Sequence, residues 1–336
     1  MNIAIIGCGL IGRKRALALN DQDVLVACCD SNEITAEKFS SEFSCTAYTD
    51  HKKLLEESNC DAVIVSVVNK YAKEIITDAL LAGKHVLAEK PLGRNVDEAK
   101  EIVGSREYVV SSKKYVVLKT GFNHRFHPAI WKAKELANEG IIGKTLNIRA
   151  RYGHGGRPGM ENEWRASKDL CGGGELLDQG VHIIDLIRWF GGEIKEVYGK
   201  VETKFWEMQV EDNAFAILKT AEDVTASFHV SWTNWKNIFS FEIFGTDGYL
   251  KIEGLGGSYG EETLETGIRK KEGGKPNIEI FEFENGDVSW INEWFEFKHS
   301  VCENKEVNGS GIDGLRAIEV IEAIYKSNQT KKTIEL

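Results

Sequence analysis

Three glycines near the start of the chain have the spacing of a phosphate-binding turn. Residues 7–12 read GCGLIG, which matches G-x-G-x-x-G, and they follow a short apolar run at residues 2–6. A buried strand, this turn and a following helix can hold the pyrophosphate of a dinucleotide at the helix N-terminus. In that pattern the first glycine permits the tight turn, the second lets the backbone approach the phosphates, and the third allows close helix packing. We therefore predict cofactor contacts from Gly7, Gly9, Leu10, Ile11 and Gly12.

A carboxylate stands where the second apolar run ends. Asp30 follows residues 24–29, lies 18 residues after Gly12 and precedes Ser31. An acidic side chain at this distance accepts hydrogen bonds from the adenosine ribose of NAD, and its charge disfavours the 2′-phosphate of NADP. We predict NAD, with Asp30 and Ser31 as contacts; a solvated aspartate at a strand end is the alternative. NADP remains an alternative cofactor, because one of the basic residues at positions 13–15 could neutralise that phosphate.

A lysine follows the fourth apolar run. Residues 85–88 are expected to form the fourth strand, and Glu89-Lys90-Pro91 come directly after it. In a sheet of order 3-2-1-4-5, strand four lies beside strand one, so Lys90 is expected at the crevice that holds cofactor and substrate. An ammonium group there stabilises the charge that develops on a substrate oxygen during hydride transfer. A surface lysine is the alternative.

Three polar side chains share one face of a helix expected over residues 175–190. Asp178, His182 and Asp185 are spaced four and three residues apart, which places them on one side. An imidazole flanked by carboxylates can accept a hydroxyl proton near neutral pH. The alternative is the solvated side of an amphipathic helix. No metal is predicted, because no second histidine stands at ligand spacing beside Cys171, Asp178 and His182.

The first part of the chain alternates strands and helices. Strands are expected over residues 2–6, 24–29, 62–68, 85–88 and 115–120, and helices over 13–20, 35–43, 72–82 and 96–103. This alternation predicts a doubly wound parallel sheet with helices on both faces, a Rossmann domain over residues 1–122.

The pattern changes after residue 122. Strands are expected over residues 145–152, 197–205, 214–220, 224–232, 239–244 and 249–252, and helices over 128–138, 175–190, 290–302 and 314–327. They predict an α+β domain over residues 123–336, built on one open, mostly antiparallel sheet that binds the substrate. The helices cover one face, and we expect the other to join copies of the chain as a homodimer or homotetramer.

Composition excludes several classes of protein. Lys and Arg number 42 against 52 Asp and Glu, a net charge of −10, so no nucleic-acid or membrane partner is expected. The seven cysteines contain no C-x-x-C pair, and the N-terminus goes straight into an apolar strand. We therefore expect neither a disulfide framework nor a secretory leader, and the reducing cytoplasm as the location.

In this order the motifs resemble the Gfo/Idh/MocA family of NAD(P)-dependent oxidoreductases, which act mainly on sugars, inositols and sugar derivatives. The resemblance spans nearly the whole chain. Besides the glycine turn it rests on EKPL at 89–92, NHRF at 123–126 with Pro128, GIIG at 140–143, Trp164-Arg165, and GGG at 172–174 leading into LDQGVHIID at 177–185. It implies that Lys90 is the active-site lysine, His182 the acid/base and Asp178 its partner. Glu89 and Lys90 would also contact the nicotinamide ribose.

The chain departs from the family pattern after the third strand. The family usually has Thr-Pro-Asn and then a histidine, whereas this chain has Val67-Val68-Asn69 and then Ala72. Val67 and Asn69 remain predicted cofactor contacts. The glycine-rich residues 151–160 could form a mobile lid. The predicted substrate contacts are Lys90, Arg125, His154, Trp164, Arg165, Asp178 and His182.

These features predict an NAD-dependent dehydrogenase of a sugar, sugar nucleotide or inositol-type polyol. One alternative is an NAD-dependent glycosidase on the same scaffold, in which a transient oxidation activates elimination and the cofactor is regenerated. The other is a cofactor-binding regulatory protein without turnover. The presence of both Lys90 and His182 argues against a pure binder.

Overall fold

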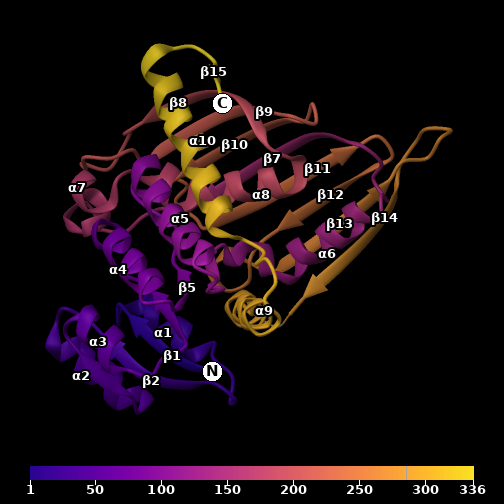
Figure 1. The fold of residues 1–336 in the computed structure, drawn as a ribbon. Coiled ribbons are helices and arrows are strands. Elements are labelled where there is room, and N and C mark those ends of the chain that lie inside the picture. The colour runs from indigo at the N-terminus through magenta and orange to yellow at the C-terminus, as the bar shows by residue number, and fades with distance from the viewer. Residues whose placement is uncertain (285) are drawn as a thin grey trace. The chain divides into compact units, whose positions relative to one another are not determined.

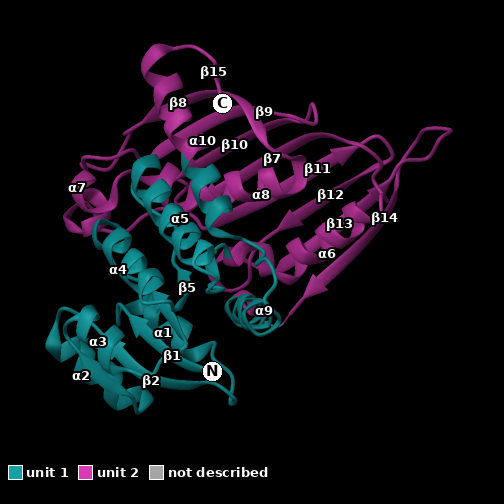
Figure 2. Cartoon of the chain, in the orientation of Figure 1, with its two compact units in different colours: residues 1–122, 290–318 teal, residues 123–289, 319–336 magenta. Residues whose placement is uncertain are grey.

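The computed structural model describes residues 1–284 and 286–336, which form two compact units (Figure 2). Unit 1 comprises Met1–Phe122 and Trp290–Ile318, and unit 2 comprises Asn123–Ser289 and Glu319–Leu336. The predicted domains were continuous, so the division differs for residues 290–318. The physical reason lies in the core of unit 1, where Trp294 and Phe297 are buried in one apolar cluster with Ile3 and Ile5.

Unit 1 contains a six-stranded parallel sheet of order β3-β2-β1-β4-β5-β6. Ile3 and Ile5 of β1 point into one apolar cluster, and Ala4 and Ile6 point into another. Because successive side chains of a strand face opposite sides, both faces of the sheet are covered. The strands are β1 (Asn2–Ile6), β2 (Val24–Cys29), β3 (Thr46–Tyr48), β4 (Ala62–Val65), β5 (His85–Ala88) and β6 (Leu118–Thr120).

Four helices of unit 1 follow the predicted alternation, whereas the helix Ser289–Glu303 was predicted for the second domain and the helix His51–Glu57 was not expected. The helices of this unit are α1 (Leu10–Leu17), α2 (Glu33–Phe43), α3 (His51–Glu57), α4 (Asn69–Leu81), α5 (Val96–Ser111) and α9 (Ser289–Glu303), and α10 (Gly311–Thr330) crosses from unit 1 into unit 2. Side-chain caps start several of them: Asn32 accepts a hydrogen bond from the amide of Thr35, and Asn95 accepts one from the amide of Glu98. Such caps satisfy amides that a helix cannot pair internally.

One predicted neighbour relation is wrong. The strand β3 was not expected, because it has only three residues and none is fully buried. The strand that ends before Lys90 is therefore the fifth, and it pairs with β4 and β6. The partner of β1 on this side is β4. Lys90 consequently follows a strand that is separated from β1 by one intervening strand.

Unit 2 contains a nine-stranded sheet of order β14-β13-β12-β11-β7-β10-β9-β8-β15. All neighbouring strands are antiparallel except β7 and β10, which are parallel. The prediction of a mostly antiparallel sheet is confirmed, although β13, β14 and β15 were not expected. The strands are β7 (Thr145–Gly153), β8 (Ile194–Glu202), β9 (Asn213–Thr220), β10 (Thr225–Ser231), β11 (Ile238–Gly245), β12 (Gly248–Glu253), β13 (Glu262–Ile268), β14 (Asn277–Phe283) and β15 (Ile334–Glu335).

The two faces of this sheet differ. The helices α6 (Pro128–Asn138) and α8 (Val181–Gly191) pack on one face (Figure 1). On the opposite face the strands β8 and β9 expose Tyr198, Phe215 and Ile217, each about half accessible. A hollow of about 610 Å³ lies among these side chains. Among the described residues, no helix is long and apolar enough to cross a membrane.

Candidate functional site

The glycine turn of unit 1 has the geometry that its spacing predicts. Gly7 has a φ of +98°, and a β-carbon there would lie 2.3 Å from the carbonyl oxygen of Ser66. A β-carbon on Gly12 would lie 2.0 Å from the carbonyl oxygen of Gly7. By contrast, a β-carbon on Gly9 would meet no atom within 4 Å, and Gly9 caps the N-terminus of α1. This open space beside free helix amides fits the pyrophosphate of a dinucleotide.

Asp30 is held at the same edge of the sheet. Its Oδ2 accepts a hydrogen bond from the amide of Cys8 at 3.0 Å, and its Oδ1 accepts one from the amide of Asn32 at 2.9 Å. The carboxylate thus joins the glycine turn to the end of β2. Exposed Ser31 follows it, and partly exposed Val67 and Asn69 follow β4. These predicted cofactor contacts all lie at the carboxyl edge of the parallel sheet, where such folds bind nucleotides.

The basic residues beside the turn have other partners. The Nε of exposed Arg13 donates to Glu42 at 2.8 Å. The ammonium of Lys14 lies 5.0 Å from the ring of Trp290. Arg15 is only 1% exposed and forms ion pairs with Glu89 and Glu293.

Glu89 and Lys90 leave the end of β5. The amide of Glu89 donates to the carbonyl oxygen of Val65 at 2.8 Å, which continues the pairing with β4 by one residue. The Glu89 side chain is 14% exposed, and its Oε1 accepts a hydrogen bond from the Nε of Arg15 at 2.6 Å. Lys90 is partly exposed, and a cis peptide bond joins it to Pro91.

In unit 2, His182 lies in a buried group of rings. The segment expected as one helix is a π-helical turn (Leu176–Gly180) followed by α8. His182, 3% exposed, stacks on the ring of His124 with centroids 3.8 Å apart. Tyr152 meets these two rings edge-on at 6.4 and 5.1 Å. Such π-helical turns are frequent at functional sites.

The two predicted carboxylate neighbours of His182 differ in their surroundings. Asp178, in the π-helical turn, is 27% exposed and lies 3.5 Å from the Nε of Arg165. Asp185 is 1% exposed and accepts hydrogen bonds from Arg125 at 2.8 and 2.5 Å. Arg125, predicted to contact substrate, is itself 3% exposed. Arg125 and Asp185 form a buried ion pair that holds the start of unit 2 on α8, and the contact of Arg125 with substrate stays a prediction.

The remaining predicted substrate residues are partly exposed. The guanidinium of Arg165 lies 4.4 Å from the ring of Trp164, so these two residues and Asp178 are brought together. His154 follows β7, and its Nδ1 accepts a hydrogen bond from the amide of Gly156 at 2.9 Å. Burial lowers the pKa of His154, which keeps its ring neutral at pH 7.

Sequence reasoning did not single out two residues of the ring group. His124 belongs to the NHRF motif, which was used only for the resemblance, so a signal existed. Tyr152 ends a strand pattern and carried no signal of its own. Burial raises the pKa of Tyr152 well above its usual value, so its hydroxyl stays protonated and can donate a hydrogen bond.

Comparison with known families defines the class of protein. Residues 1–108 match the family described as oxidoreductases with an NAD-binding Rossmann fold, and residues 130–251 match the GFO/IDH/MocA C-terminal domain. A dTDP-3,4-didehydro-2,6-dideoxy-alpha-D-glucose 3-reductase of Actinomadura kijaniata is 30% identical over 74% of each chain. The protein belongs to the Gfo/Idh/MocA family of oxidoreductases. The predicted family, fold class and oxidoreductase activity are confirmed.

Two further likenesses cover the whole chain. A myo-inositol 2-dehydrogenase of Thermotoga maritima is 27% identical and covers 100% of this chain and 98% of its own length. The solved structure of a levoglucosan dehydrogenase in complex with NADH has a TM-score of 0.91 at 22% identity, with coverage of 100% of this chain and 98% of that chain. At this identity the second likeness shows the fold alone.

A matched pair of glycine substitutions tests the turn. Gly9→Ala should leave the free energy of unfolding within about 0.5 kcal/mol of the wild type, because φ is −75° and the site is open. The new methyl group fills the space for the phosphates, so NADH affinity should fall at least about tenfold, or about 1.4 kcal/mol. Gly7→Ala should instead destabilise the fold by more than about 1 kcal/mol. Thermal unfolding and calorimetric titration measure both; unchanged NADH affinity in Gly9→Ala would refute the assignment.

Proposed function

We propose that this protein transfers hydride between NAD and a secondary alcohol or ketone of a sugar, sugar nucleotide or inositol-type polyol. The observation that carries the proposal is the open Gly9 position at the N-terminus of α1, with the carboxylate of Asp30 held beside the same turn. The names of the relatives support the substrate class, since they include a myo-inositol dehydrogenase and a dTDP-sugar reductase.

Each candidate residue has a role in this proposal. When bound, NAD supplies the nicotinamide carbon that accepts or returns the hydride. His182 takes the proton of the reacting hydroxyl, and Lys90 donates a hydrogen bond to that oxygen and stabilises its developing charge. Asp178 is the partner of His182 near the reacting carbon. We expect Trp164, Arg165 and His154 to contact the substrate.

Turnover measurements test these roles. His182→Ala and Lys90→Met should each lower kcat by about 10²–10⁴-fold, because each removes a group that acts in the transition state. NADH affinity should change little in His182→Ala. The exposed His299, whose side chain is 61% accessible, provides the control His299→Ala, which should keep full turnover. Substrate is found first by following NADH formation over free sugars, inositols and sugar nucleotides.

The same assay separates the alternatives. A glycosidase that regenerates its cofactor would consume glycosides without net NADH, and a regulatory protein would bind NADH without turning over any of these substrates. Near-normal turnover in His182→Ala would instead return this histidine to a structural role. His154 would then be the next candidate for the proton acceptor.

NAD is the proposed cofactor in preference to NADP. The carboxylate of Asp30 would repel a 2′-phosphate, and Arg13, Lys14 and Arg15 have other partners. Calorimetric titration should therefore give a lower Kd for NADH than for NADPH, and Asp30→Ala should narrow the difference. Tighter NADPH binding by about tenfold, or about 1.4 kcal/mol, would contradict the proposal.

We also propose that copies of the chain associate through the uncovered face of the nine-stranded sheet, as a homodimer or homotetramer in the cytoplasm. The half-exposed Tyr198, Phe215 and Ile217 support this, because such apolar patches commonly mark interfaces. Light scattering should give a multiple of the 37.6 kDa chain mass at micromolar concentration. Ile217→Lys should shift the distribution toward the monomer. A wild-type monomer would contradict this assembly.

A further inference from the structure

A buried guanidinium joins the glycine-turn helix to the strand end that carries Glu89 and Lys90. Arg15 lies in α1, and its side chain is 1% exposed. Its Nε donates to Glu89 at 2.6 Å, and its Nη1 donates to Glu293 of α9 at 2.6 Å. The ring of Trp290, also in α9, lies 4.5 Å from the guanidinium carbon. One side chain thus joins α1 to two other segments of unit 1, the end of β5 and α9.

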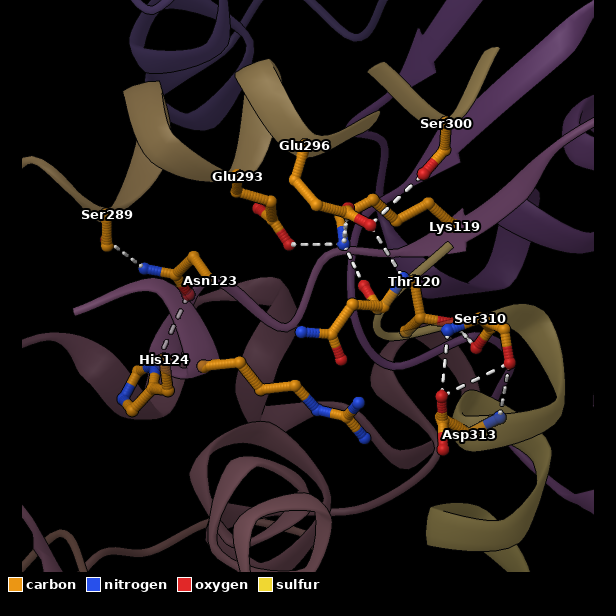
Figure 3. A network of polar contacts seen from close by, with 12 residues as sticks. Lys119, Thr120, Asn123, His124, Ser289, Glu293, Glu296, Ser300, Ser310 and Asp313 are labelled. Atoms are coloured by element: carbon orange, nitrogen blue, oxygen red, sulfur yellow. Dashed lines mark hydrogen bonds and ion pairs between the residues drawn. The ribbon is translucent and has the colours of Figure 1, made fainter. Parts of the chain in front are cut away.

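The anchor of this guanidinium is itself held in place. The side chain of Glu293 is fully buried, and its Oε1 lies 3.8 Å from the ammonium of Lys119. Lys119 is in β6, the strand that pairs with β5. Lys119 also pairs with Glu296, one helical turn along α9, at 3.1 Å. Figure 3 shows Glu293 and Glu296 directed toward this lysine. The helix α9 is therefore fixed to the sheet by charge-assisted bonds as well as by its apolar side.

Glu89 is confined on its other side by a glycine. A β-carbon on Gly121 would lie 3.1 Å from the Oε2 of Glu89 and 2.8 Å from the Nη2 of Arg15. The amide of Gly121 donates to the carbonyl oxygen of Ala88, directly before Glu89. The carboxylate of Glu89 therefore lies between α1 and the end of β6, and its hydrogen bond to Arg15 fixes its orientation.

We propose that Arg15 is a positioning residue that orients the carboxylate of Glu89 to accept hydrogen bonds from the nicotinamide ribose hydroxyls. The inference rests on the proposed function and on the family resemblance, which implies that Glu89 contacts that ribose. A guanidinium presents its donors in a fixed plane, so it sets the orientation of a carboxylate more closely than an ammonium does. The helix α9, through Glu293, holds the guanidinium in turn. Arg15 then belongs to the nicotinamide half of the site, although it lies three residues after the third glycine of the phosphate turn.

The choice of variant follows from burial. Removing the cation alone would leave the fully buried carboxylate of Glu293 without its closest partner, which is strongly destabilising. Arg15→Lys keeps the charge and loses the planar fork. The double variant Arg15→Met/Glu293→Gln removes one charge of each sign. It replaces Arg15→Lys in the experiment if Arg15→Lys does not fold. Arg13→Lys makes the same chemical change at an exposed neighbour paired with Glu42 and is the matched control.

A comparison of two nucleotides separates positioning from general support of α1. NADH contains the nicotinamide ribose, whereas ADP carries only the adenosine and phosphate half. In Arg15→Lys the Kd for NADH should rise about tenfold, and the Kd for ADP should stay within about twofold of the wild type. Arg13→Lys should change neither. In a Glu89→Gln background the Arg15→Lys change should add little, because the oriented carboxylate is already gone.

Other results would overturn the inference. An equal loss of NADH and ADP affinity would make Arg15 a support of the phosphate turn only. An unchanged Kd for NADH in both Arg15 variants would show that Glu89 needs no such positioning. If the wild-type protein bound ADP no more weakly than NADH, the nicotinamide half would make no contacts of value, and the proposed function would fail with the inference. Calorimetry on the folded 336-residue chain distinguishes these outcomes.

Discussion

The charge of one buried arginine constrains much of unit 1. Burial opposes the charge of Arg15, but the carboxylates of Glu89 and Glu293 outweigh that effect and raise the pKa of Arg15 above its usual value. Burial also opposes the charge of Glu293 and raises the pKa of its carboxyl group, although the positive charges of Arg15 and Lys119 act in the other direction. A buried ion that loses its partner costs several kcal/mol. The helix α9 must therefore fold with the parallel sheet of unit 1, although it comes more than 150 residues after the last strand of that sheet. For this reason the observed units differ from the two continuous domains predicted from the sequence.

Backbone sterics made the nucleotide half of the fold predictable. Gly7 and Gly12 are required by atoms of the turn itself, so their spacing carries its own physical reason. The three residues of β3 offered no alternating pattern, because burial does not differ clearly between their two sides. That one missed strand displaced the predicted neighbour of β1. Sequence periodicity therefore predicted which residues follow the ends of strands. It did not predict which strands are neighbours in the sheet.

In unit 2 the sequence located the polar positions of α8 but not their partners. The spacing of Asp178, His182 and Asp185 predicted an imidazole flanked by two carboxylates on one face of a helix. Asp185 instead lies against Arg125, which is 60 residues away in sequence, and only tertiary contacts decide that pairing. The π-helical turn at Leu176–Gly180 also changes the angular relation of Asp178 to His182. Residue spacing cannot reveal such a turn, because it adds no residue type that an α-helix would exclude.

The buried rings of unit 2 bear on whether the protein is a catalyst or only a binder. His182 and His124 are 3% and 5% exposed, and they stack against each other beside Tyr152. Apolar side chains of similar volume would fill this place with a smaller desolvation cost. Proteins keep such polar clusters where function requires them, at some expense of stability. A protein that only senses bound nucleotide in unit 1 would gain nothing from imidazoles buried in unit 2, whereas a proton-transfer enzyme would.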